Sequence, residues 1–308
     1  MLDEVETKNL RSERSQQMTT TPIGEGSLGC LVRLFFSFRN IIRSRQSNFG
    51  MLSRLKRSAR ARRARAKISR TWQILRRKCN RGYCSICERQ VYFAIEGPYL
   101  RNDYKCVNCQ SIPRWRALMF VVAELYPKWR ELKIHESSPG GPLSAKLARE
   151  CPKYLPTHFF PDTPRGQIHR GFRCEDLMAQ TFENESFDLV ITSDVFEHLP
   201  DVALAVREVM RTLKPGGAHI FTVPWVRWKK TLVRALVKDG VLQHLEKPDY
   251  HGNPIDGSGS LVFTEWGVEL PFLLQDWGKF PVIIHTIRDR SLGIDGQFPE
   301  VFVQQKPY

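Results

Sequence analysis

Four cysteines carry the clearest chemical signal in this sequence. Cys84 and Cys87 form one C-x2-C pair, and Cys106 and Cys109 form a second pair after eighteen intervening residues. Each C-x2-C turn places two thiolates on one side of the chain, and two such turns can surround one tetrahedral ion at Zn–S distances of ~2.3 Å. The spacing therefore predicts a closed, structural zinc site with these four ligands.

A disulfide-bonded pair is the alternative interpretation of these cysteines. The other cysteines show no extracellular disulfide framework, which favours the metal site. They are Cys30, Cys79, Cys151 and Cys174. Cys79 is either a substitute ligand or a free thiol. Residues 88–105, between the two pairs, suit two short strands that support the turns, so we expect a zinc ribbon over residues 80–111.

A second candidate site lies in the segment HESSPGGP, residues 135–142. It follows an apolar run, LKI, and precedes a helix-like run, LSAKLARE. A strand, a tight glycine turn and a helix form the usual layout of a nucleotide-cofactor loop, in which glycines let the backbone approach the ligand. Glu136 would supply a carboxylate, and Gly140 and Gly141 the close approach. A plain turn with a capping acid is the alternative, and the G-x-G-x-x-G spacing of a dinucleotide oxidoreductase is absent.

Over residues 112–308, apolar strands alternate with helices. These elements must position the candidate cofactor loop. Strand-like segments at 186–193 and 217–224 flank a helix whose apolar stripe comprises Val202, Val206, Val209, Met210 and Leu213. Such alternation predicts an α/β body with a mostly parallel sheet covered on both faces. The last two strands follow one another without an adequate helix, so we expect an antiparallel terminal hairpin. Ligands should bind at the carboxyl ends of the parallel strands.

The segment FDLVITSDVFEHLPDVALAVREVMRTLKPGGAHIFTVP, residues 187–224, resembles a class I S-adenosylmethionine-dependent methyltransferase of the methyltransferase type 11 group. That group has FD at the fourth strand, EHL at a helix opening, an L-K-P-G-G turn and a fifth strand ending near proline, and all are present here. The resemblance extends over about Leu132 to Lys306. It implies a seven-stranded Rossmann-like methyltransferase sheet, S-adenosylmethionine as cofactor and methyl transfer as the activity.

The resemblance also assigns cofactor-binding residues. It places Glu136 at the acidic position of the loop and Ser138, Gly140 and Gly141 in its turn, with Ser138 where the family usually has glycine. The ribose position falls at Thr157 or His158, and His158 could bond a hydroxyl or be a partly buried strand histidine. Asp176 would accept from the adenine amino group and Leu177 would donate its backbone amide, while helix capping is the alternative role of Asp176.

The acceptor side of the implied site has three candidate general bases. Ser193 and Asp194, after the fourth strand, would lie near the sulfonium end of the cofactor. Asp194, His198 or His251 could take a proton if the acceptor must lose one. The alternatives are capping and packing for His198, and a surface loop for the PDYHGNPIDG segment that contains His251, in the polar insertion after the fifth strand.

The net charge of +15 is concentrated in one segment. Residues 26–78 contain 16 Lys and Arg and no Asp or Glu, so the rest of the chain is nearly neutral. The basic arm, residues 51–79, could attract RNA or an anionic membrane surface, or it is a solvated lead-in without a partner. No apolar run is long enough to cross a membrane.

We therefore expect a disordered start (1–50), a basic helical arm (51–79), the ribbon (80–111) and a methyltransferase domain (112–308). The predicted function is cytoplasmic methyl transfer to a small molecule, a saccharide or RNA. The alternative is a non-catalytic nucleic-acid-binding protein that uses the ribbon and the basic arm.

Overall fold

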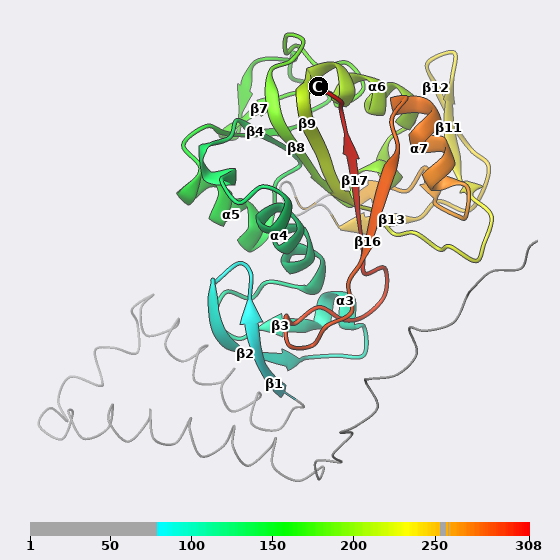
Figure 1. Cartoon of the computed structure of the whole chain (residues 1–308). Helices are drawn as coiled ribbons and strands as arrows, with labels where there is room; N and C mark the ends of the chain where they lie inside the picture. Colours follow the sequence, from blue (N-terminus) through cyan, green and yellow to red (C-terminus); the bar gives the residue numbers. More distant parts are fainter. Residues whose placement is uncertain (1–78, 253–256, 258) are drawn as a thin grey trace, which may run out of the picture. The chain divides into compact units, whose positions relative to one another are not determined.

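The computed structural model describes residues 79–252, 257 and 259–308. The predicted disordered start (1–50) and the basic arm (51–79) lie outside these residues, apart from Cys79. The described residues belong to one compact unit, which contains a small cysteine-bearing sheet and an α/β body (Figure 1).

The cysteine-bearing sheet has three antiparallel strands. Strand β1 (Cys79–Cys84) pairs with β2 (Arg89–Ile95), and β2 pairs with β3 (Tyr104–Cys106). The short helix α3 (Leu100–Asp103) leads into β3. Each pair of cysteines sits at a tight turn after β1 or β3, and Glu88 and Gln110, which close these turns, have positive φ angles of 52° and 64°. The two strands predicted between the cysteine pairs are β2 and β3, and β1, which precedes the first pair, completes the sheet.

The α/β body is built on one mixed sheet with the strand order β16-β17-β9-β8-β4-β5-β7-β6. The central strands β7, β5, β4, β8 and β9 are mutually parallel, whereas β17 runs antiparallel to both β9 and β16. The bounds are β4 Ile134–Ser137, β5 Tyr154–His158, β6 Ile168–His169, β7 Phe172–Cys174, β8 Phe187–Ser193, β9 Leu213–Thr222, β16 Val282–Thr286 and β17 Glu300–Gln305. The α/β class and the antiparallel terminal hairpin are as predicted.

The predicted count of seven strands is wrong by one. The additional strand, β6, pairs two residues antiparallel to β7 at the edge of the sheet. Arg170 and Gly171 make the reversal between them with positive φ angles of 48° and 85°. Ile168 is 70% exposed, so β6 has no buried face and shows no apolar alternation that could reveal it.

Helices cover both faces of the sheet (Figure 1). Side chains of α4 (Pro113–Leu125) and α5 (Gly141–Glu150) pack with Ile134, Leu189 and Ile220 in one buried cluster. Side chains of α6 (Val202–Thr212) and α7 (Leu270–Gly278) pack with Val190 and Phe221 in a second cluster. Successive strand residues thus point to opposite faces, as expected for a sheet that is buried on both sides.

Helix α6 confirms the predicted apolar stripe, because Val202, Val206, Val209 and Met210 are buried. Asp201 caps its first turn by accepting a hydrogen bond from the Leu204 amide at 3.0 Å. The helix ends earlier than the predicted Pro215-Gly216-Gly217 turn, since β9 already begins at Leu213. A Cβ at Gly217 would lie 2.8 Å from the Asp188 carbonyl oxygen, so the close pairing of β9 with β8 requires glycine there.

The cysteine-bearing sheet shares its buried side chains with the body. Ile86 and Phe93 belong to the same cluster as α4 and Ile294. The loop before β17 closes the junction, since Ser291 accepts a hydrogen bond from the Tyr83 amide at 2.6 Å. The sheet and the body are therefore packed together as one folded unit.

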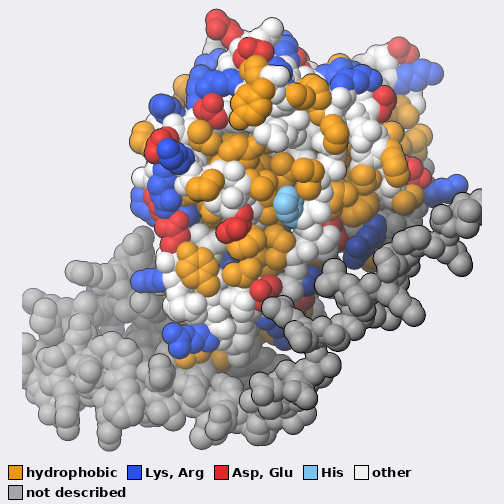
Figure 2. Space-filling view, viewed as in Figure 1, with side chains coloured by type: hydrophobic (Ala, Val, Ile, Leu, Met, Phe, Trp, Pro, Cys, Tyr) orange, Lys and Arg blue, Asp and Glu red, His pale blue; other side chains and the backbone are white. Residues whose placement is uncertain are grey.

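Part of the sheet face on the α4 side stays open. Val282 and Ile284 of β16 pack into the α6–α7 cluster, so the alternate residue Ile283 points to the other side, where it is 57% exposed. The space-filling view shows apolar side chains across the middle of the viewed face and Lys and Arg toward its edges (Figure 2). None of the described helices is long and apolar enough to cross a membrane.

The insertion after β9 contains three small antiparallel pairs. Strands β10 (Leu232–Val233) and β15 (Thr264–Glu265) pair, as do β11 (Ala235–Lys238) with β12 (Val241–His244), and β13 (Tyr250–Gly252) with β14 (Gly259–Leu261). The β13–β14 pair brings His251 to the carboxyl edge of the main sheet.

Candidate active site and cysteine cluster

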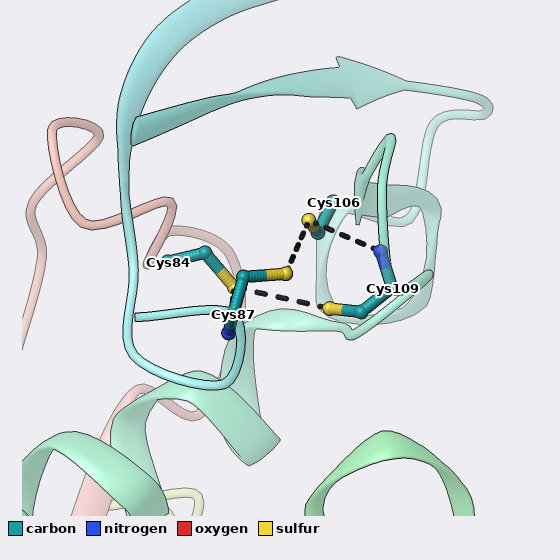
Figure 3. Close-up of side chains that lie close together, drawn as sticks. All are labelled: Cys84, Cys87, Cys106 and Cys109. Carbon is teal, nitrogen blue, oxygen red and sulfur yellow. Dashed lines mark hydrogen bonds between the residues drawn. The ribbon is translucent and has the colours of Figure 1, made fainter. Parts of the chain in front are cut away.

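The four predicted metal ligands lie together (Figure 3). The Cys84 and Cys109 sulfur atoms are 3.9 Å apart, and those of Cys87 and Cys106 are 3.7 Å apart. A tetrahedral ion with Zn–S distances of ~2.3 Å requires sulfur separations of about 3.8 Å, so the spacing fits such an ion. The described cysteines form no disulfide, and Cys79 is not part of the cluster.

Groups around the cysteine cluster stabilise negative charge. The amides of Cys87 and Cys109 lie 3.5 Å from the sulfur atoms of Cys84 and Cys106. Arg116 is fully buried, and no carboxylate of the described residues pairs with it; backbone carbonyls of Ser111, Tyr104 and Gly293 accept its hydrogen bonds. Burial lowers the pKa of Arg116 to about 10, and the charge of the neighbouring sulfur atoms opposes that shift. A buried cation thus lies close enough to Cys84, Cys106 and Cys109 to interact with charge on their sulfur atoms.

A cavity of about 790 Å³ opens at the carboxyl ends of β4, β5 and β8. This is the edge at which a parallel α/β sheet binds its ligand. Most of the predicted cofactor-binding and catalytic residues line it. They are Glu136, Ser138, Gly140, His158, Ser193, Asp194, His198 and His251.

Glu136 is the buried carboxylate of the cavity. The Ser144 hydroxyl donates to its Oε1 at 2.9 Å, and the Tyr154 hydroxyl donates to its Oε2. Burial raises the pKa of Glu136 to about 7, although these two hydrogen bonds act in the opposite direction. No lysine or arginine of the described residues forms an ion pair with it, so its negative charge is available to a ligand.

The loop after β4 is held by a few hydrogen bonds. Ser138 takes a positive φ of 56°, and its amide donates to the Thr157 carbonyl at 2.8 Å. The Gly140 amide donates to the Ser144 hydroxyl at 2.7 Å, which links the turn to Glu136. The Ser138 hydroxyl lies 3.4 Å from Nδ1 of His158, at the end of β5. Glycine is thus not required at position 138, since serine adopts the turn.

Three predicted cofactor residues do not line the cavity. Gly141 has a positive φ of 69°, and a Cβ there would lie 2.3 Å from the Trp115 ring, so this glycine lets Trp115 pack on the loop. Asp176 accepts from the Met178 amide at 2.8 Å within a local turn, and since no helix begins there it is not the helix cap of the alternative interpretation. Leu177 is buried in the α6–α7 cluster. Trp115 itself lines the cavity.

Asp194 is held by two arginines that sequence reasoning missed. Arg101 from α3 donates to its carboxylate at 2.5 Å, and Nε of Arg114 at the start of α4 approaches it at 3.3 Å without the angle of a hydrogen bond. The Thr222 hydroxyl also donates to it at 2.9 Å. Burial alone would raise the pKa of Asp194, but the two guanidinium groups outweigh it and lower the pKa to about 2. Such a carboxylate is a weak base, which disfavours the predicted role of Asp194 as a proton acceptor.

Glu197, His198 and His251 form a second cluster at the cavity. Glu197 and His198 belong to the short 3-10 helix η3 (Phe196–His198), and their ligand atoms lie within 4.8 Å of each other and of His251. Nδ1 of His198 lies 2.9 Å from the Leu261 carbonyl. Burial raises the pKa of Glu197 well above its usual range, and the nearby Asp194 adds to this shift. The insertion therefore brings His251 to a buried acid and a half-buried imidazole.

Comparisons with known proteins point to methyltransferases. Residues 159–221 match the family described as a methyltransferase domain. Over 75 residues the chain is 33% identical to a 2-methyl-6-phytyl-1,4-hydroquinone methyltransferase from a Synechocystis species, covering 21% of this chain and 24% of that protein. Over 55 residues it is 43% identical to a chloroplastic tocopherol O-methyltransferase from Arabidopsis thaliana, covering 18% and 16%. The chain thus spans a quarter or less of these relatives.

Solved methyltransferase structures resemble a larger part of the chain. An S-adenosylmethionine-dependent methyltransferase from Mesorhizobium loti has 15% identity and a TM-score of 0.40, and the match covers 62% of this chain and 98% of that one. A Burkholderia thailandensis N1-methyltransferase with bound S-adenosylhomocysteine has 15% identity and a TM-score of 0.37, with 62% and 77% covered. The segment that matches the methyltransferase-domain family, residues 159–221, contains Ser193, Asp194 and His198.

Proposed function

We propose that this chain is an S-adenosylmethionine-dependent methyltransferase whose cofactor occupies the cavity at the carboxyl ends of β4, β5 and β8. The observation that carries the proposal is Glu136, a buried carboxylate without an ion-pair partner among the described residues, at the cofactor-binding edge of the sheet. The methyltransferase-domain match over residues 159–221 supports it. The cofactor's ammonium group would be the partner of Glu136, and His158 and Ser193 would border the rest of the molecule.

Methyl transfer needs alignment more than acid–base chemistry, because the sulfonium already activates the methyl carbon. The acceptor would enter between the insertion and the segment that carries Tyr99 and Asn102, since both border the cavity. His198 and His251 are the basic groups on this side. In this proposal Asp194 has no base role and instead fixes Arg101 and Arg114 in the cavity wall.

We also propose that zinc is held by Cys84, Cys87, Cys106 and Cys109. Four thiolates leave no open position for a substrate, so the metal would be structural. Its role would be to hold the two turns of the cysteine-bearing sheet. Through these turns it would also position α3, whose Arg101 reaches Asp194.

The affinity for S-adenosylmethionine should depend on pH through Glu136. The ammonium group favours the ionised carboxylate, and this carboxylate ionises at a pKa of about 7. Below pH 7 the affinity should therefore fall roughly tenfold for each pH unit, and above pH 8 it should be constant. Calorimetric titration of the full chain between pH 5.5 and 8.5 measures this dependence.

Glu136→Gln is the variant for this experiment, and Glu208→Gln on α6 is its control. Glu136→Gln should bind roughly tenfold more weakly at pH 8 and lose the pH dependence. Glu208→Gln should behave as the parent, because Glu208 pairs with Arg211 and does not line the cavity. Absence of binding by the parent at every pH would overturn the proposed function, whereas pH-independent binding would overturn only the role of Glu136.

A further inference from the structure

Glu197 is a buried acid that the proposed methyl transfer does not use. It is 1% exposed, and neither of its carboxylate oxygens has a hydrogen-bond partner among the described residues. A buried carboxylate in this state is costly unless it is protonated or bound to a cation. Arg101 and Arg114 are close enough to lower its pKa, but both are engaged by Asp194. Among the described residues, Glu197 therefore has no lysine or arginine that binds its carboxylate directly.

Two imidazoles, those of His198 and His251, lie beside the Glu197 carboxylate. Oε1 of Glu197 lies 3.8 Å from Nε2 of His198, and the rings of His198 and His251 are 5.1 Å apart and nearly perpendicular, at 88°. One ligand atom from each of the three residues lies within 4.8 Å of the other two. Small side-chain rotations would bring all three within the ~2.0–2.2 Å of one ion that is usual for nitrogen and carboxylate ligands.

The tautomer of His198 is also fixed in the manner of a metal ligand. A carbonyl oxygen can only accept, so the 2.9 Å contact with Leu261 means that Nδ1 of His198 carries the hydrogen. Nε2 then presents its lone pair toward Glu197. Metal-bound histidines usually donate their other ring N–H to a carbonyl or carboxylate in this way.

The insertion couples the third ligand to the other two. Leu261 of β14, which holds His198, pairs directly with Tyr250 of β13, the neighbour of His251. The Phe263 amide donates to the Glu197 carbonyl at 2.8 Å. The β13–β14 pair therefore positions His251 relative to both Glu197 and His198.

We propose that Glu197, His198 and His251 bind a divalent first-row transition cation at the acceptor side of the cavity. Two histidines and one carboxylate form an open ligand set, which leaves positions for water or a substrate oxygen. His198, His251 and Leu261 border the cavity, so these positions face it. This cation site is separate from the closed cysteine cluster and differs from it in ligand chemistry.

The site defines the class of acceptor, and this step rests on the proposed function. An acceptor hydroxyl bound to the cation has a lowered pKa and releases its proton to water. Its oxygen then forms a bond to the methyl carbon while the carbon–sulfur bond breaks, and the electron pair of that bond stays on sulfur. The products are a methyl ether, S-adenosylhomocysteine and one proton. The acceptor is therefore a compound with a hydroxyl group that can bind a metal.

Cobalt(II) is a suitable probe for the zinc-loaded full chain, with binding followed by calorimetry and visible absorption. We expect one equivalent to bind, without the thiolate-to-cobalt charge-transfer band that replacement of zinc at the cysteines would produce. His198→Gln and Glu197→Gln should weaken binding by at least roughly tenfold. His244→Gln is the matched control, because His244 is an exposed histidine of the same insertion outside the cluster.

A thermal unfolding series keeps the test independent of catalysis. Cobalt(II) should raise the Tm of the parent and of His244→Gln, but not that of Glu197→Gln. Absence of binding by the parent, or equal binding by His198→Gln, would refute the site. Titration of S-adenosylmethionine into the same samples separates the two proposals. Cobalt binding without cofactor binding would support the metal site and refute the proposed methyltransferase function.

Discussion

Cys106→Ser is expected to release the zinc that we propose for the cysteine cluster and to lower the free energy of unfolding by several kcal/mol. Structural zinc binding contributes about 10–16 kcal/mol of apparent free energy in small zinc-dependent peptides, and a lost ligand removes much of it. Cys106 is fully buried at the end of β3, and the sheet that it anchors belongs to the same buried cluster as α4. The loss of order should therefore extend into the body.

The same substitution should weaken binding of S-adenosylmethionine. Tyr99, Arg101 and Asn102 reach the cavity from the segment between β2 and β3, which the cysteine cluster holds. Without the metal, this wall of the cavity loses its support. Metal analysis by mass spectrometry, thermal unfolding and cofactor titration on one preparation would measure the three effects together.

Cys151→Ser is the matched control for this experiment. Cys151 is equally buried, and its sulfur contacts the Leu132 carbonyl at 3.1 Å, a contact that a serine hydroxyl can replace. Its cost should be about 1 kcal/mol, with the zinc content unchanged. A Cys106→Ser protein that still carries one zinc per chain, with the parent's Tm, would show that the cysteine cluster is not a metal site.

Local patterns in the sequence predict most of the fold. Strand β8 and helix α6 follow from apolar periodicity, and the cysteine cluster follows from a spacing that two short turns fix by themselves. The carboxyl-end location of Glu136, His158 and Ser193 follows from the parallel topology alone. These features depend on residues close in sequence, or on the general geometry of the fold.

The rest of the site depends on contacts between distant residues. Arg101 meets Asp194 across 93 positions of sequence, and nothing around Arg101 indicates a buried ion pair. Arg116 is fully buried beside the cysteines, and no local pattern in the sequence indicates this. Asp176 and Leu177 follow the family pattern, but Asp176 closes a local turn and neither residue lines the cavity.

Asp194→Asn is expected to lower the free energy of unfolding by about 3–5 kcal/mol, because it leaves buried cations without their counter-ion. The side chain of Arg101 is 4% exposed and that of Arg114 is 19% exposed, and Asp194 is the only carboxylate of the described residues that pairs with either. The remaining partners of the Arg101 guanidinium are the carbonyls of Gln297 and Phe298, at 3.3 and 2.9 Å. Those neutral acceptors cannot replace a charge.

A double-mutant cycle with Arg101→Met distinguishes this ion pair from simple loss of packing. If Asp194 acts through Arg101, the double variant should be about 1–3 kcal/mol more stable than the sum of the two single effects predicts. Asp188→Asn is the control, since Asp188 pairs with Lys214 near the surface and should cost less than about 1 kcal/mol. Urea unfolding of the four proteins and the control gives these values. Additive effects would mean that Arg101 and Asp194 contribute separately. Coupling would instead mean that Asp194, through Arg101, adds to the contacts that hold the cysteine-bearing sheet at the cavity.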